Sequence, residues 1–264
     1  MDDSTGSQPT IYDVAGGVAT ITLNRPERKN SLGAELVDAL ADDIERAVAS
    51  SEVRAIQVTN AGNTFCAGAD LKAAAPGVSG AVTARWTFVG LLELIMDAPK
   101  PVIGRIDGHA TGGGVGLAAA CDISVMRDDA KIGFTEVRIG VAPAVISVVC
   151  LPKMSRADAL ELFLTGDRFT PARAAEAGLI TAAAPPDELD ATVAHYLDMV
   201  VRGGPAALAA SKDLVFRVPA MSRTEAFAWT EVRSRELFEG PEAAEGIAAF
   251  RERRDAPWVP PADG

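Results

Sequence analysis

Segments with the periodicity of a β-strand alternate with helical segments over the first two thirds of this 264-residue chain. Residues 18–24 (VATITLN) alternate apolar and polar side chains and are rich in β-branched types, which predicts a strand. Apolar residues recur at helical spacing over residues 36–48, and residues 54–59 (RAIQVT) have the pattern of a buried strand. A strand at 101–106 precedes a short apolar helix at 115–120. This alternation is typical of an α/β fold.

The remaining segments divide the chain into three predicted parts. Residues 86–96 predict a further helix, residues 122–126 and 131–134 predict short strands, and Ser31 is a candidate cap for the helix at 36–48. From about residue 155 the pattern is almost entirely helical, with proline and glycine breaks between segments. We expect a disordered tail over residues 1–10, a core over residues 11–200 and a helical region over residues 201–264.

Composition and charge exclude several classes of protein. The net charge of −11 and the pI of about 4.7 disfavour nucleic acid and anionic membranes as partners. No apolar run approaches the length of about 18 residues that crosses a membrane, and the acidic N-terminus lacks the pattern of a signal peptide. The three cysteines are widely spaced and form no C-x-x-C pair, which fits a reducing compartment. We therefore expect a cytoplasmic enzyme without a disulfide framework.

Two glycine-bearing turns carry the chemical signal. Residues 65–71 (FCAGADL) follow a strand and its loop, and residues 112–114 (GGG) stand between a strand and a helix. Unpaired N–H groups at the start of a helix, with the positive end of the helix dipole behind them, suit an anion or a developing oxyanion. Neither turn matches a Walker A loop, because no Gly-Lys-Ser/Thr follows, and the glycine spacing fails the dinucleotide fingerprint.

The ordered set of motifs around these turns resembles the crotonase superfamily over nearly the whole chain. The shared motifs are Leu23-Asn24-Arg25-Pro26, Asn30-Ser31-Leu32, the turn at 65–71, Pro101-Val102-Ile103, Asp107-Gly108 with the triple glycine, Cys121-Asp122, Phe134-Thr135-Glu136, Leu164-Thr165-Gly166-Asp167, Ala174-x-x-Ala177-Gly178-Leu179 and Glu245–Phe250. Each motif is moderately specific, and their order makes the set highly specific.

The resemblance implies a fold, a substrate and an oligomer. The fold is a spiral of ββα units, with a helical C-terminal region that forms homotrimers, often paired into hexamers. The substrate is an acyl-CoA thioester whose carbonyl oxygen is held by the N–H groups of Ala69 and Gly113. CoA is then part of the substrate, and no separate cofactor or metal is expected. The residues expected to meet CoA are Arg25, Arg28, Lys29, Ala67, Asp70, Leu71, Lys72 and Phe250.

The resemblance leaves the reaction open. The two-glutamate hydratases carry their first glutamate at the position of Gly116 and their second at the position of Glu136, so this chain keeps one acid/base group. Apolar neighbours are expected to raise the pKa of Glu136. We therefore expect an enoyl-CoA hydratase-like enzyme with a single glutamate. The alternatives are a Δ3-Δ2 enoyl-CoA isomerase and a catalytically silent CoA-binding homologue.

Other polar side chains are weaker candidates for catalysis. His109 is expected to make a structural hydrogen bond, and His195 to lie on a helix surface or pack. Ala144 stands where dienoyl-CoA isomerases carry an aspartate, which disfavours that activity. Cys66 beside the first turn is expected to pack, with a reactive thiol as the alternative. The two histidines are far apart in the sequence and have no acidic pair nearby, so a metal site is not predicted.

Overall fold

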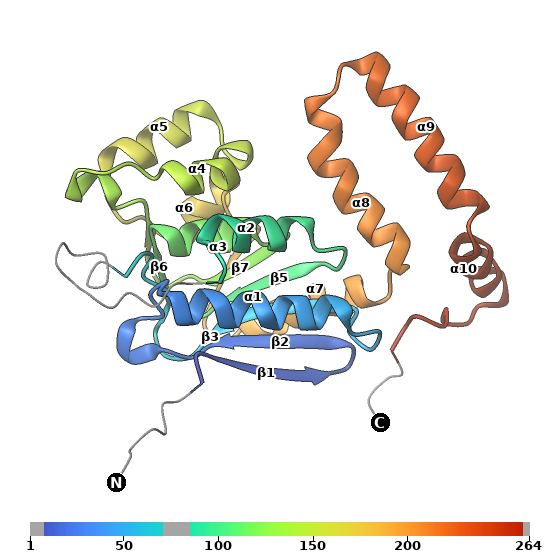
Figure 1. The fold of residues 1–264 in the computed structure, drawn as a ribbon, viewed down its shortest axis with the longest axis horizontal. Helices are drawn as coiled ribbons and strands as arrows, with labels where there is room; N and C mark the ends of the chain where they lie inside the picture. The colour runs from blue at the N-terminus through green and yellow to red at the C-terminus, as the bar shows by residue number, and fades with distance from the viewer. Residues whose placement is uncertain (1–7, 71–84, 261–264) are drawn as a thin grey trace, which may run out of the picture.

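The computed structural model describes residues 8–70 and 85–260 and has the mixed α/β architecture that the sequence predicts (Figure 1). The main sheet has six strands in the order β1-β2-β3-β5-β7-β9. Its strands are β1 (Thr10–Ala15), β2 (Val18–Leu23), β3 (Ala55–Asn60), β5 (Val102–Ile106), β7 (Ile123–Arg127) and β9 (Ala182–Ala184). Strands β1 and β2 pair antiparallel, and all other pairs are parallel. A second, parallel sheet contains β4 (Thr64–Cys66), β6 (His109–Thr111) and β8 (Ile132–Gly133).

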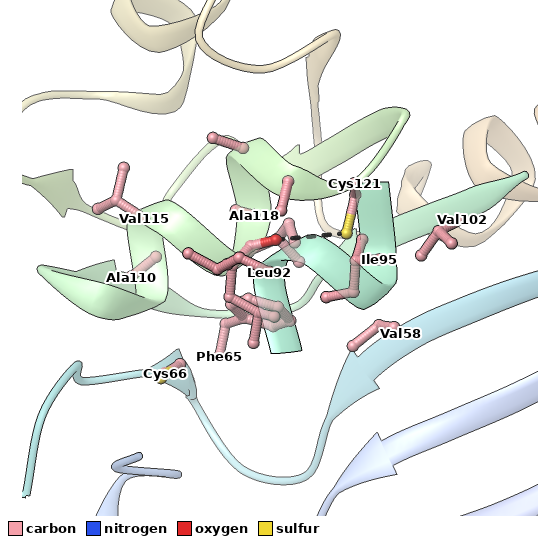
Figure 2. Close-up of a cluster of buried hydrophobic side chains, with 14 of the residues drawn as sticks. Val58, Phe65, Cys66, Leu92, Ile95, Val102, Ala110, Val115, Ala118 and Cys121 are labelled. Carbon is pink, nitrogen blue, oxygen red and sulfur yellow. Dashed lines mark hydrogen bonds between the residues drawn. The ribbon is translucent and has the colours of Figure 1, made fainter. Parts of the chain in front are cut away.

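Helices α1, α2 and α3 contribute the buried residues that form one core with the strands. Helix α1 (Ala34–Ala49) turns six residues inward, among them Leu36, Leu40 and Ile44, at the three- and four-residue spacing of one helix face. Helix α2 (Phe88–Asp97) contributes Leu92 and Ile95 to the same core (Figure 2). Residues from β3 and β4 meet these helices and α3 (Gly113–Ala120) there, so the two glycine turns are attached to one rigid, close-packed body.

Of the remaining helices, those from α5 onward lie in the predicted helical last third. In chain order, the remaining helices are η1 (Pro26–Arg28), η2 (Glu136–Ile139), α4 (Ala144–Cys150), η3 (Leu151–Lys153), α5 (Arg156–Thr165), α6 (Pro171–Glu176), α7 (Leu189–Val201), α8 (Pro205–Arg217), η4 (Val218–Ala220), α9 (Arg223–Glu239) and α10 (Pro241–Glu252). No helix within residues 8–70 or 85–260 combines the length and the apolar character needed to cross a bilayer.

Several local expectations differ from the structure. The cap of α1 is Gly33, whereas Ser31 lies two residues before it, so the predicted serine cap is wrong. Helix α3 begins at Gly113, inside the triple glycine, two residues before the predicted start. Strand β9 consists of three alanines, which have no strand propensity, and it forms because it pairs with the edge of β7. Strand β1 begins at Thr10, the last residue of the predicted tail, and residues 1–7 lie outside the described residues.

The C-terminal helices form an arm that extends from the core. Figure 1 shows α8 rising away from the sheet and α9 running back, and α10 begins near the start of α8, where the N–H groups of Ala206 and Ala207 donate to the Glu242 carboxylate. Within the described chain α9 buries no residue, and α8 buries only Ala210. Phe227 and Phe238 on α9 are 70% and 73% exposed. The arm therefore presents apolar side chains that this single chain does not cover.

Candidate active site

The two glycine turns meet backbone against backbone. Gly68 has a φ of +83°, and a β-carbon built on it would lie only 2.9 Å from the Gly113 nitrogen and 2.9 Å from the Thr111 carbonyl oxygen. Only glycine combines that dihedral with that approach. The turn is also fixed from the other side, because the Leu32 N–H donates to the Gly68 carbonyl at 2.8 Å and Leu32 bridges to Ala69. The predicted convergence of the two turns is present in the fold.

The N–H groups of Ala69 and Gly113 are available to a ligand. Gly113 is the first residue of α3, so its N–H has no acceptor within the helix and lies at the positive end of the helix dipole. Neither of these two N–H groups donates a hydrogen bond to any of residues 8–70 and 85–260. Both residues line the same pocket. This arrangement offers main-chain donors to an electron-rich atom.

A buried asparagine holds the first turn in place. Asn30 is 0% exposed, and its side-chain amide donates to the carbonyls of Ala61 and Thr64 at 3.1 and 2.7 Å. Its amide oxygen accepts from the Arg25 N–H at 2.7 Å. The adjoining Lys29 carbonyl accepts from the Ala67 N–H at 3.0 Å. The loop that contains the predicted basic cluster is thus bonded directly to the turn. Asn30 belongs to a motif in the sequence, but no local pattern indicates this positioning contact.

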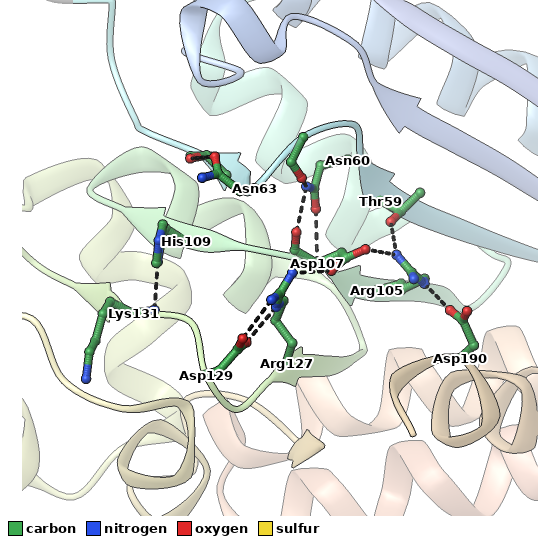
Figure 3. Close-up of polar contacts among 12 residues, drawn as sticks. Thr59, Asn60, Asn63, Arg105, Asp107, His109, Arg127, Asp129, Lys131 and Asp190 are labelled. Carbon is green, nitrogen blue, oxygen red and sulfur yellow. Dashed lines mark hydrogen bonds and ion pairs between the residues drawn. The ribbon is translucent and has the colours of Figure 1, made fainter. Parts of the chain in front are cut away.

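A second polar network fixes the chain that leads into the triple glycine (Figure 3). Asn60 donates to the Asp107 carbonyl at 2.9 Å and accepts from the Asp107 N–H at 3.0 Å. The Asp107 carboxylate lies 3.0 Å from Arg105 and 3.2 Å from Arg127. His109 accepts from the Lys131 N–H through Nδ1 at 2.9 Å, as the structural interpretation of this histidine predicts. The network ties strands β3, β5 and β7 to the connection between β5 and β6.

Glu136 faces the second glycine turn. A β-carbon on Gly112 would lie 3.3 Å from Oε1 of Glu136, so the carboxyl is packed against the turn. Oε2 is buried and accepts no hydrogen bond from residues 8–70 and 85–260. Burial raises the pKa of Glu136, as the apolar neighbours predict, and a hydrogen bond from its own backbone opposes the rise. A carboxyl group in this environment exchanges protons nearer to neutral pH than an exposed glutamate.

The pocket that contains these groups is small and apolar. It has a volume of about 250 Å³. Its lining consists of Leu32, Ala69, Phe88, Gly113, Glu136, Ala142, Pro143, Ala144, Val145 and Ile146. Glu136 is the only ionisable side chain among these lining residues. The pocket can therefore hold an apolar group beside one carboxyl and main-chain N–H donors.

The position of the absent glutamate is occupied by another helix. Gly116 is buried, and a β-carbon on it would overlap with Cγ2 of Ile146 and lie 2.8 Å from the Ile146 Cβ. Helix α4 therefore packs directly on the backbone of α3 at this point. The absence of the carboxylate follows from the resemblance to the family, whereas its replacement by an isoleucine 30 residues later is visible only in the fold.

The structure places the predicted CoA residues in different surroundings. Arg25 forms an ion pair with Glu35 at 3.7 Å, while Arg28 and Lys29 are exposed in the loop beside the first turn. The Asp70 carboxylate lies 3.9 Å from where a Gly33 β-carbon would stand, next to the start of α1. Leu71 and Lys72, and the loop at 73–80, lie outside the described residues. Phe250 is on α10, is 85% exposed and does not line the pocket.

The remaining candidates have structural surroundings. Cys66 is buried, and burial raises the pKa of its thiol to about 12, so it packs as expected and the alternative of a reactive thiol is wrong. Asp122 accepts from the Val102 N–H and from Lys212 and is a structural ion-pair partner. His195 lies on α7 beside Tyr196. No group of three metal-ligating side chains occurs within residues 8–70 and 85–260.

Comparisons with known proteins agree with this fold. The chain is 33% identical over 261 residues to carnitinyl-CoA dehydratase of Proteus mirabilis, covering 96% of this chain and 98% of that protein. It is 30% identical over 249 residues to (E)-benzylidenesuccinyl-CoA hydratase of Thauera aromatica, covering 93% and 97%. The crystal structure of enoyl-CoA hydratase from Mycobacterium tuberculosis superposes with a TM-score of 0.85 at 31% identity, covering 95% and 98%.

A family model agrees with these pairwise similarities. The model described as enoyl-CoA hydratase/isomerase matches residues 13–260, a range that contains both glycine turns, Glu136 and all three helices of the arm. The match, the relatives and the shared fold give one result. This chain is a member of the enoyl-CoA hydratase/isomerase family, within the crotonase superfamily.

Proposed function

We propose that this protein adds water to a 2-enoyl-CoA thioester, with Glu136 as its single acid/base group and the N–H groups of Ala69 and Gly113 as its oxyanion hole. The observation that carries the proposal is the shared pocket, in which a half-buried carboxyl stands beside two main-chain donors with no other acceptor among the described residues. The CoA-dependent hydratase and dehydratase among the relatives support the same substrate class.

The reaction follows from these groups. The Glu136 carboxylate takes a proton from water as the water oxygen bonds to the β-carbon of the substrate. The electrons of the carbon–carbon double bond move toward the carbonyl, and the thioester oxygen becomes an enolate oxygen. Donors at Ala69 and Gly113 stabilise that charge, and one such donor is typically worth about 3–4 kcal/mol. Glu136 then returns its proton to the α-carbon, which completes the addition of one water molecule.

The loop bonded to the first turn supplies positive charge for binding the CoA phosphates. The Lys29 carbonyl accepts from the Ala67 N–H, so the exposed side chains of Arg28 and Lys29 project from a loop fixed beside the oxyanion hole. Local positive charge at this place offsets the net charge of −11, which otherwise repels the CoA phosphates. We assign the binding of the CoA phosphates to this loop.

A Δ3-Δ2 enoyl-CoA isomerase is the second candidate, and the contact between Gly116 and Ile146 favours it. With an isoleucine against that glycine, Glu136 has no second carboxyl opposite it among the lining residues. One carboxyl suffices to remove a proton from the α-carbon of a 3-enoyl thioester and return it to the γ-carbon. Hydration and isomerisation would use the same oxyanion hole, at Ala69 and Gly113, and the same base, Glu136.

The proposal includes a homotrimer or a hexamer in the cytoplasm. The arm supports the oligomer, because α9 buries no residue within the described chain and exposes Phe227 and Phe238. Three free, buried cysteines fit a reducing compartment. Light scattering coupled to size-exclusion chromatography gives the number of chains, and a monomer at micromolar concentration would contradict the oligomer.

One pair of substrates separates the candidate reactions. Loss of the conjugated thioester absorbance from a 2-enoyl-CoA supports hydration, and its appearance from a 3-enoyl-CoA supports isomerisation. Glu136→Gln is expected to lower the rate of either reaction by about 100- to 10,000-fold while acyl-CoA binding is retained. Binding of acyl-CoA with no turnover of either substrate would identify a silent homologue.

A further inference from the structure

We infer that Ile146 sets the acyl specificity of this site and restricts it to short, purely hydrocarbon acyl groups. The inference rests on the proposed function and adds the substrate class to it. Ile146 is 3% exposed and lines the pocket together with Glu136, Ala69 and Gly113. It therefore stands beside the reacting groups and not at the pocket entrance alone.

Because Ile146 contacts Gly116, its side chain closes the space between α3 and α4 at one side of the pocket. The space next to Gly116 is filled by Cγ2 and Cβ of Ile146, so no channel passes between α3 and α4 at this point. Isoleucine is branched at its β-carbon and has a restricted χ1 angle, so this side chain cannot swing aside easily. An acyl chain that enters past Glu136 must end before this contact.

The dimensions of the pocket agree with a short acyl group. Its volume of about 250 Å³ is below the range of roughly 300–1,000 Å³ that is typical of sites for drug-sized ligands. The thioester itself takes part of that space, because its oxygen must reach the donors of Ala69 and Gly113. A few carbon atoms fill the remainder.

The lining also selects against charged acyl groups. Apart from Glu136, the lining residues within 8–70 and 85–260 have aliphatic or aromatic side chains or are glycine. A second carboxylate or an ammonium group on the acyl chain would lose its water without gaining a partner from these residues. This distinguishes the predicted substrate from acyl groups that carry their own charge.

The test compares Ile146→Ala with the wild-type protein across a series of acyl chains. The measurements are kcat/KM for 2-enoyl thioesters and calorimetric binding of the unreactive butanoyl-, hexanoyl-, octanoyl- and decanoyl-CoA. We expect the wild-type protein to prefer butanoyl or hexanoyl, and Ile146→Ala to improve the octanoyl-to-butanoyl ratio by about 10-fold or more, since one methylene in an apolar pocket is worth roughly 10- to 200-fold. Ile146→Val, a smaller change, keeps the test usable if the alanine variant is unstable.

Val148→Ala is the matched control, because Val148 is on the same helix and is 67% exposed. Its chain-length profile should equal that of the wild-type protein. Equal binding of butanoyl- and decanoyl-CoA by the wild-type protein, or an unchanged profile in both Ile146 variants, would overturn this inference while leaving the proposed reaction intact. Failure of the wild-type protein to bind any acyl-CoA would overturn both.

Discussion

The α-carbon of Gly68 lies 3.5 Å from where a β-carbon on Gly113 would stand, so residues 45 positions apart in sequence share one point of main-chain contact. At this contact the turn after β4 and the start of α3 come together. The donors of Ala69 and Gly113 belong to these two segments. Their relative position therefore depends on the absence of a side chain at residue 68.

Gly68→Ala tests this dependence. The added methyl group would lie 2.9 Å from the Gly113 nitrogen in a residue with a φ of +83°, so the turns must separate. We expect kcat to fall by about 100- to 1,000-fold, the effect of losing one oxyanion donor.

Gly140→Ala is the control for backbone strain in the Gly68 experiment. Gly140 has a φ of +78°, and nothing lies within 4 Å of the added carbon. Thermal unfolding of this variant measures the cost of the positive φ alone. A Gly68→Ala protein that is destabilised no more than Gly140→Ala and keeps its full kcat would show that the contact has no part in catalysis.

Lys212 links helix α8 of the arm to the core, and we expect its substitution to lower the stability of the protein. Its ammonium group donates to the Asp122 carboxylate at 2.9 Å and to the Ile95 carbonyl at 2.8 Å, and both side chains are largely buried. Burial raises the pKa of Asp122, and Lys212 opposes that rise. Lys212→Met leaves the carboxylate without its main counter-charge, so we expect the free energy of unfolding to fall by about 3–5 kcal/mol.

The matched variant for Lys212 is on the same helix. Arg217→Met removes an exposed ion pair with Asp213 at 2.6 Å, which is expected to contribute less than about 1 kcal/mol. Adding Asp122→Asn to Lys212→Met should recover part of the loss, because it removes the unpaired charge. Equal urea midpoints for the Lys212 and Arg217 variants would contradict the anchoring role.

The sequence predicts those helices and strands whose own residues repeat a clear apolar pattern. The apolar face of α1 and the alternation in β2 repeat over several residues, and both elements form where expected. Strands β6 and β9 have three residues each and depend on their neighbours, so their own residues do not indicate them. The sequence also does not predict how the arm extends from the core. Apolar residues on α9 predict burial, yet this single chain leaves them exposed.

The candidate site likewise has residues that the sequence motifs predict and contacts that only the fold reveals. The donors at Ala69 and Gly113 and the carboxyl of Glu136 could be named from motifs, because glycine turns and a single glutamate have fixed places in the family pattern. The contacts of Asn30 and Ile146 join segments about 30 residues apart or more, so no local pattern contains them. The resemblance to the family shows which group is missing at residue 116, and only the packing shows which group replaces it.

The contact between Gly116 and Ile146 predicts non-additive effects on stability. Alanine is favoured over glycine in a helix by about 1 kcal/mol, but the new methyl group would overlap with Ile146. Overpacking of this kind costs typically about 1–3 kcal/mol, so we expect Gly116→Ala to be destabilising. Ile146→Ala removes Cγ2, the atom with the larger overlap, and keeps Cβ, which would still lie 2.8 Å from the new methyl group. The double variant therefore relieves most of the overlap, and the two changes should cost less together than their sum. Additive unfolding free energies in this double-mutant cycle would disprove the contact.

The raised pKa of Glu136 predicts opposite pH effects on activity and on stability. Hydration begins with Glu136 as a carboxylate, so kcat/KM should rise with pH through an apparent pKa above the ordinary glutamate value of about 4.3, and Glu136→Gln should lack this limb.

In the folded protein burial favours the protonated form of Glu136. Its stabilising contribution is complete below the ordinary pKa and is lost as the pH rises through the raised pKa. Glutamine is neutral throughout, so Glu136→Gln should gain stability relative to the wild-type protein over that interval. Denaturant unfolding at a series of pH values measures the difference, and a difference that does not change with pH would mean that the carboxyl is solvated in the folded protein.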